Sequence, residues 1–377
     1  MALALSVYVC SLDADVVERY YSRGVYPWVA GFLGAGVGWL PFSLGDCLYA
    51  LAAGWLLVAG WQGFRQMRRI GRGSLPRLFW SGFMAALWVY VFFQLLWGLN
   101  YDRPAIDHHL GLDPRASDTA LLPALTTSLL KKANAYASAG LRQEQTSRYL
   151  YQKARLGYLK ARDSFPALQV PHFSFKPSLF GVVGNYIGYS GYFNPFTGEG
   201  QLNTHTPSFV HPFVTCHELA HQLGYAREQE ANLVGFLAAR VSPEASFRYA
   251  AYLEMFLYAY RDFYRIDSAA ARECYAQSSP AVKRDIQALQ DFQRQYRTPF
   301  GLATDWLYDH YLRWNGQPEG LRAYGRVVSW LLALYRQEGG WRSGDTAAAF
   351  KIDSSTSYSP QAFPPVRCIL RSASGCT

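Results

Sequence analysis

Two long uncharged segments near the N-terminus constrain the fold of this chain more than any other feature of its sequence. Residues 47–64 form an 18-residue run without a charged side chain, and residues 78–99 form a second, more apolar run. A helix of this length can cross the hydrocarbon core of a bilayer. Trp80 and Trp97 lie near the two ends of the second run, where aromatic rings favour the headgroup region. We therefore predict two membrane-spanning helices rather than a pair of buried soluble helices.

Two other apolar segments precede these runs. Residues 25–42 are interrupted by Gly and Pro, so an interfacial or re-entrant segment competes with a further span. Residues 1–10 are too short to cross a bilayer, and they lack the basic start and small-residue cleavage site of a removable signal peptide. We assign residues 1–100 to a membrane anchor.

Five arginines and no acid lie in the loop between the two predicted spans: Arg65, Arg68, Arg69, Arg72 and Arg77. The positive-inside rule places such a loop in the cytoplasm, so the chain after Asn100 is expected outside the cytoplasmic membrane. The net charge of +9 could also indicate nucleic acid. Because the arginines lie between apolar runs and no basic patch alternates with aromatic residues, we predict a lipid bilayer as partner and no nucleic acid.

The rest of the chain has the pattern of a mainly helical domain with a small strand region. Residues 101–180 and 208–337 are mostly helical in pattern, whereas residues 181–206 are rich in Gly and aromatic residues, which is typical of turns and short strands. We predict one domain over residues 101–338. Residues 339–377 are rich in Gly, Ser and Pro and are predicted to be a poorly ordered tail.

One motif concentrates the chemistry, His217-Glu218-Leu219-Ala220-His221. Residues four apart share a face of a helix, so His217 and His221 can bind one zinc ion. Glu218 lies beside them and can act as general base, taking a proton from the water that zinc activates. Because this pattern also occurs by chance, the prediction requires a third ligand.

That ligand is expected on a second helix that begins near Arg227. Gly224 suits a sharp turn at the end of the first helix. Glu228 and Asn232 are four residues apart on the second helix, so Glu228 can complete a His-His-Glu set while Asn232 orients a histidine.

Glu230 is the competing third ligand. We prefer Glu228 because of its spacing from Asn232, and we expect Glu230 to point elsewhere, toward solvent. The side chains expected to pack inward from this helix are Leu233, Val234 and Leu237.

Two further features could support catalysis. Residues 198–203 could form an edge strand that binds an extended peptide, or a plain surface hairpin. Tyr311 and Tyr324 are candidate donors to the oxyanion that forms in the transition state of peptide hydrolysis.

Four segments together resemble a bacterial family of uncharacterised multi-span membrane proteins with a glutamate-zincin-like domain: PFSLGD (41–46), WGLNYDR (97–103), GYFNPFTGEGQLN (191–203) and HELAHQLGYAREQEAN (217–232). The resemblance extends from about residue 16 to residue 337. It implies a zincin-like metallopeptidase domain with zinc ligands at His217, His221 and Glu228 and a general base at Glu218. It also implies a bacterial cytoplasmic membrane, and members usually begin with a fuller first membrane helix than this chain has.

The favoured function is a zinc endopeptidase that cleaves peptides or proteins at the outer face of the membrane. A non-catalytic zinc-binding receptor or sensor is the alternative, and Glu218 argues against it because binding alone needs no general base. The two motif helices carry too many polar residues for an intramembrane protease. The sequence leaves the substrate and the oligomeric state open.

Overall fold

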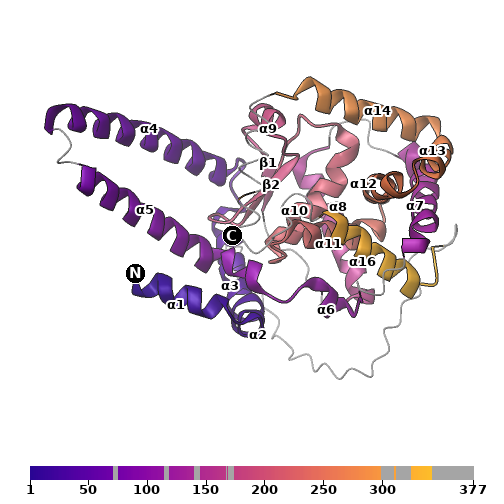
Figure 1. Cartoon of the computed structure of the whole chain (residues 1–377), viewed down its shortest axis with the longest axis horizontal. Helices are drawn as coiled ribbons and strands as arrows, with labels where there is room; N and C mark the ends of the chain where they lie inside the picture. The colour runs from indigo at the N-terminus through magenta and orange to yellow at the C-terminus, as the bar shows by residue number, and fades with distance from the viewer. Residues whose placement is uncertain are drawn as a thin grey trace, which may run out of the picture.

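The structure, a computed structural model, describes residues 1–70, 75–113, 119–139, 145–166, 168, 174–298, 310 and 324–341. Within these ranges the chain is mainly helical, with one small three-stranded sheet. Figure 1 shows a long helical hairpin that is joined at one end to a rounded helical domain. This confirms the predicted fold class, mainly α with a small β region behind two long apolar helices.

The hairpin consists of α4 (Leu44–Ile70) and α5 (Leu75–Leu96). Stretches of 23 residues in α4 and 21 in α5 are long and apolar enough to cross a membrane, and only 11% of the most apolar window of each is buried within the molecule. At a rise of 1.5 Å per residue these stretches measure about 32–34 Å, and the hydrocarbon core is about 30 Å thick. Both helices are therefore candidate membrane spans.

The second span ends earlier than predicted. α5 stops at Leu96, and the 3₁₀-helix η3 (Gly98–Asp102) follows it. Trp97 is only 5% exposed and lies in the domain, so its predicted place in the headgroup region is wrong.

The segment before the hairpin packs against α5 and against one side of the domain. It contains α1 (Ala2–Ser11), α2 (Ala14–Val16), the π-helix η1 (Val17–Val25) and α3 (Tyr26–Val37). α3 has 12 residues, which is too short to cross a bilayer. Its side chains Tyr26 and Ala30 pack with Trp97 and Ala226 of the domain. The helix in residues 25–42 is thus too short for a third span, and the interfacial segment stays a prediction.

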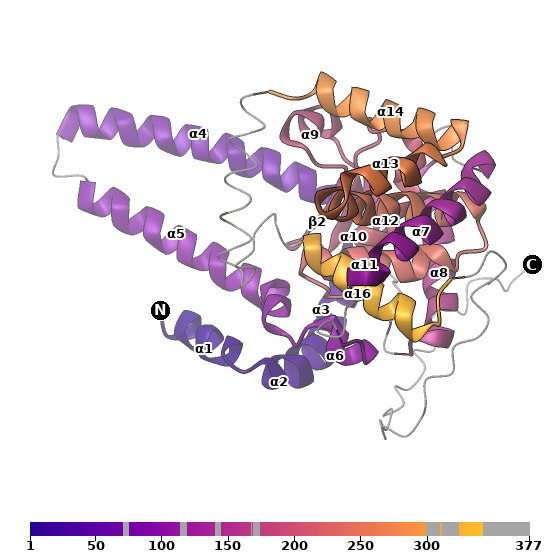
Figure 2. The ribbon, with the colours of Figure 1, turned by 45° about the vertical axis from the view of Figure 1, so that its right-hand side comes forward.

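The helical domain is built around α10, α11 and α12, which pack on one another and on α7 and α8. Figure 2 shows α16 crossing in front of α11, with which it is in contact. The bounds of the domain helices are α6 (Ile106–Leu110), α7 (Leu122–Tyr136), α8 (Ser147–Ser164), α9 (Gly181–Ile187), α10 (His211–Gln222), α11 (Glu228–Arg240), α12 (Ala245–Ile266), α13 (Ser268–Ala276), α14 (Pro280–Gln295) and α16 (Tyr324–Gln337). The predicted division at residue 100 stays a prediction, and the tail beyond residue 341 lies outside the described residues.

The sheet contains β1 (Phe175–Pro177), β2 (Gly191–Asn194) and β3 (Glu199–Leu202) in the order β1-β3-β2. β3 pairs in parallel with β1 and antiparallel with β2. The predicted edge strand is therefore wrong in position, because β3 is central and fully buried and β2 lies at the edge. The same region also contains α9, where the sequence indicated turns and strands.

Candidate metal centre

The helix α10 carries both histidines of the motif. Pro212 stands in its first turn, where a proline breaks no helical hydrogen bond. Gly224 follows the helix with a φ of +84°, a left-handed conformation that favours glycine. A Cβ on Gly224 would also lie 2.9 Å from Oδ1 of Asn100. The sharp turn expected at this glycine is thereby confirmed.

The helix α11 begins at Glu228, as expected, and lies close against α10. A Cβ on Gly235 would lie 3.1 Å from the backbone nitrogen of His217, so this glycine permits the close approach of the two helices. Three apolar side chains of α11 are fully buried, as predicted: Leu233, Val234 and Leu237.

The two helices bring His217, His221 and Glu228 into one group. Nε2 of His217 lies 3.2 Å from Nε2 of His221 and 3.3 Å from Oε2 of Glu228. Nε2 of His221 lies 3.8 Å from Oε1 of Glu228. One ligand atom from each residue lies within 4.8 Å of the others, so the group could hold a metal ion.

These separations fit zinc. Ligand atoms at about 2.0–2.1 Å from a tetrahedral zinc ion lie about 3.3 Å from one another. The orientation of the rings also fits: Nδ1 of His217 lies 2.9 Å from Oδ1 of Asn232, and Nδ1 of His221 lies 2.8 Å from the backbone oxygen of Tyr225. Because these oxygens accept hydrogen bonds, each Nδ1 carries the proton and each Nε2 offers its lone pair. Asn232 thus makes the contact expected of an orienting residue.

The carboxylate of Glu218 lies beside this group and is only 3% exposed. A Cβ on Gly191 of β2 would lie 2.7 Å from its Oε1, so the edge strand passes directly against it. Its Oε2 has no hydrogen-bond partner in the described part of the chain. Burial raises the pKa of Glu218 to about 8, although the charge of His217 lowers it and that of Glu228 raises it further. A carboxylate with a pKa near neutrality is suited to accept and return a proton.

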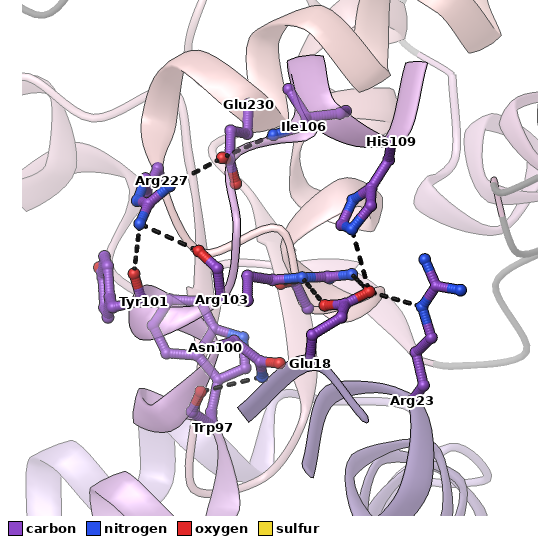
Figure 3. A network of polar contacts seen from close by, with 11 residues as sticks. Glu18, Arg23, Trp97, Asn100, Tyr101, Arg103, Ile106, His109, Arg227 and Glu230 are labelled. Atoms are coloured by element: carbon purple, nitrogen blue, oxygen red, sulfur yellow. Dashed lines mark hydrogen bonds and ion pairs between the residues drawn. The ribbon is translucent and has the colours of Figure 1, made fainter. Parts of the chain in front are cut away.

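Glu230 points away from the metal group but does not reach solvent. It is 1% exposed, and its Oε1 accepts hydrogen bonds from the backbone nitrogen of Ile106 and from Nη1 of Arg227, both at 3.2 Å. Figure 3 shows this arrangement. The expected solvent exposure was wrong because the backbone N–H and the guanidinium compensate for the burial of the charge.

Side chains from the predicted anchor hold the end of α10. The last carbonyls of a helix lack helical partners. Nε1 of Trp97 donates to the backbone oxygen of His221 at 3.0 Å, and the hydroxyl of Tyr26 donates to that of Gln222 at 2.8 Å. Sequence reasoning missed both contacts, since they join residues more than one hundred positions apart.

A buried charge network secures the turn between α10 and α11. Nη1 of Arg103 donates to the backbone oxygen of Gly224 at 3.1 Å, and its Nε donates to Oε2 of Glu18 at 2.8 Å. Figure 3 shows Glu18 between Arg103, His109 and Arg23. Burial alone would raise the pKa of Glu18, but the hydrogen bond from His109 and the charge of Arg103 hold that pKa well below its usual value. No local sequence pattern distinguishes Glu18, because its partners Arg103 and His109 lie far away in the sequence.

The two tyrosines predicted as oxyanion donors lie outside what the structure describes. Tyr311 is outside the described residues. Tyr324 is the first residue of α16, and only its backbone is described. Another tyrosine does lie beside the site: Nδ2 of Asn232 donates to the hydroxyl of Tyr258 at 3.5 Å, and Glu254 is hydrogen bonded to the same hydroxyl. Among 27 tyrosines, no local pattern distinguishes it.

Comparison with known proteins gives a family and no function. The chain belongs to the family described as "Protein of unknown function (DUF3810)", whose model matches residues 21–332. No curated protein and no solved structure matches the chain. The prediction of an uncharacterised family over most of the chain is thereby confirmed.

Proposed function

With membership of this family as the premise, we propose that the protein is a membrane-anchored zinc metallopeptidase that hydrolyses peptide bonds. The observation that carries the proposal is the buried Glu218 beside the His-His-Glu group, because the Oε2 of Glu218 has no hydrogen-bond partner among the described residues. Buried carboxylate oxygens in structural roles are almost always hydrogen bonded. An unpaired oxygen at this position favours a group that contacts a reactant.

Each residue of the group then has a distinct role. His217, His221 and Glu228 would hold the ion through three positions and leave the fourth open, as in catalytic zinc sites. A zinc ion bound there would polarise the scissile carbonyl and lower the pKa of a nearby water molecule. Glu218 would take the proton from that water and deliver it to the leaving amine.

The edge of the sheet supports a peptide or protein substrate. β2 lies at the edge, and its Gly191 faces Glu218. An extended peptide can add to such an edge through main-chain hydrogen bonds. A peptide bound along β2 would place one of its peptide bonds next to the carboxylate of Glu218.

The shape of the hairpin supports an extracytoplasmic domain. The domain adjoins one end of the hairpin, and Figure 1 shows α4 ending and α5 beginning at the other end. Arg65 and Arg68 precede the end of α4 and Arg77 follows the start of α5, so the positive-inside rule favours the cytoplasm for that end of the hairpin. We therefore propose that the metal centre lies on the outer side of a bacterial cytoplasmic membrane.

A reporter enzyme that is active only outside the cytoplasm tests this topology. Fused after residue 341, it should be active, and an inactive but intact fusion would reverse the topology.

The decisive experiment compares metal content and hydrolysis in the full-length protein purified in detergent. We expect about one zinc ion per chain in the parent and a sharp loss in His217→Ala and Glu228→Ala. Glu218→Gln should retain zinc but lose hydrolysis of a mixture of internally quenched peptides. A chelator should abolish hydrolysis and added zinc should restore it. His108→Ala and Glu273→Ala, both at exposed positions, are the matched controls.

The outcomes separate the two functions. Hydrolysis that survives in Glu218→Gln contradicts the proposed mechanism. Zinc without any hydrolysis in the parent favours the alternative, a zinc-binding receptor or sensor that cleaves nothing. A well-folded parent without metal contradicts both.

A further inference from the structure

The short helix α9 (Gly181–Ile187) exposes the side chains that a helix in water normally buries. Leu179, Val182, Val183 and Tyr186 have the spacing i, i+3, i+4, i+7, which places them on one face. Their exposed fractions are 57%, 51%, 54% and 43%. No charged residue occurs between Lys176 and Glu199, so α9 and its flanking residues carry no charge.

The opposite face of α9 packs on the domain through small and polar residues. A Cβ on Gly181 would lie 2.6 Å from Nδ1 of His205, and a Cβ on Gly184 would lie 2.5 Å from the ring of Tyr189. Oδ1 of Asn185 accepts a hydrogen bond from Asn203 at 2.8 Å. These close contacts prevent α9 from rotating its apolar face inward.

The apolar face begins beside the first turn of the candidate span α4. The backbone nitrogen of Leu179 donates to Oδ2 of Asp46 at 2.6 Å, and Asp46 is fully buried in the first turn of α4. Figure 1 shows α9 next to the domain end of this helix. Trp39 and Phe42, which directly precede α4, are 76% and 42% exposed.

We propose that the exposed face of α9 lies in the interfacial region of the bilayer that α4 enters, and that it holds the metal centre at the membrane surface. A lipid surface fits this face because interfacial helices insert an apolar side to a shallow depth, and aromatic residues favour the same region. Continuity with α4 supports this occupant over a second protein. The inference rests on the proposed spanning role of α4 and α5.

The position of α9 connects the membrane to the chemistry. The chain runs from α9 directly into β2, whose first residue, Gly191, faces Glu218. A bilayer in contact with α9 is therefore close to the edge strand beside the metal centre. Substrates are then expected to be polypeptides held at the membrane surface.

Photocrosslinking of the full-length protein in vesicles of phosphatidylethanolamine and phosphatidylglycerol tests this contact. Benzoylphenylalanine would replace Val183 on α9, Leu56 in the middle of α4, or Glu273 on α13. Leu56 is 62% exposed on α4, and Glu273 is exposed on α13, which Figure 1 shows on the side of the domain away from the hairpin. After irradiation, mass spectrometry should detect lipid adducts at positions 183 and 56 and none at 273. The metal content of each variant should equal that of the parent, which shows that the fold is intact.

Three other results would contradict the membrane contact of α9, and each has a different meaning. Lipid adducts at position 56 without adducts at 183 leave the span in place and remove α9 from the membrane. A crosslinked dimer at 183 instead of a lipid adduct identifies a second copy of the chain as the occupant. No lipid adduct at position 56 removes the span and the inference together, while the metal measurements still test the peptidase separately.

Discussion

The helices α11 and α9 belong to the same domain, yet they place their glycines and apolar side chains on opposite faces. α11 buries its apolar side chains, including Leu233 and Leu237 at 0% exposure, and uses Gly235 to approach α10. α9 turns its glycines toward the domain and its Val182 and Val183 outward. A mixture of glycine and apolar residues therefore does not determine a helix's environment. The face on which the glycines lie does.

The largest effect on the free energy of unfolding is expected at Glu18, whose partner Arg103 holds the turn that leads into α11. Glu18→Ala would leave Arg103 buried without its partner, and removing one member of a buried ion pair costs about 3 to 5 kcal/mol. Chemical unfolding of the protein in detergent at pH 7 measures this loss. Glu273→Ala, at an exposed position, should change the free energy of unfolding by less than about 0.5 kcal/mol.

The same variant predicts a pH dependence. The pKa of Glu18 is held well below its usual value of 4.5 in the folded protein. Its stabilising contribution is therefore fully present above pH 4.5 and is lost as the pH falls below it. The difference in unfolding free energy between the parent and Glu18→Ala should stay constant from about pH 6 to 8 and shrink in more acidic solution. An undiminished difference at pH 4 would exclude the ion pair as its source.

Truncation of one apolar side chain on each helix tests the comparison directly. Leu237→Ala should cost about 2 to 5 kcal/mol because it opens a cavity in the core of the domain. Val183→Ala should cost less than about 0.5 kcal/mol in detergent, since its side chain makes few contacts with the domain. Equal losses in the two variants would show that α9 is packed like an ordinary core helix.

Glycine replacements compare a buried helix contact with an open helix surface. Gly235→Ala should cost about 1 to 3 kcal/mol because the added Cβ would meet the backbone of His217 at 3.1 Å. Gly54→Ala in α4 meets nothing within 4 Å and should be stabilising by about 0.5 to 1 kcal/mol or neutral. Thermal unfolding measures both, and zinc content should fall only in Gly235→Ala.

The most local effect is expected in zinc affinity and compares two asparagines with different partners. Asn232→Ala should weaken zinc binding about 10- to 100-fold because Nδ1 of His217 loses its acceptor. Asn232→Asp keeps an acceptor and should restore part of the affinity. Asn185→Ala, which removes a contact of α9 to Asn203, should leave zinc affinity unchanged. Competition with a chelator of known affinity measures all three, and equal losses in the two alanine variants would refute an orienting role for Asn232.

Much of the metal centre could be predicted because its parts are close in sequence. The four-residue spacing of His217 and His221, the turn at Gly224 and the start of α11 at Glu228 follow from helical periodicity and from the left-handed conformation that glycine adopts. The burial of Glu230 did not follow, because its partner Ile106 lies 124 positions away.

The sequence by itself determined the hairpin and the helical positions of the motif. A run of uncharged residues of this length has few stable environments other than a bilayer, and side chains four apart meet on any helix. Only the tertiary structure decided which strand lies at the edge, which face of α9 is exposed and how Trp97 comes to hold α10. These features depend on long-range pairs such as β1 with β3 and Trp97 with His221, and no local pattern of residues specifies such partners.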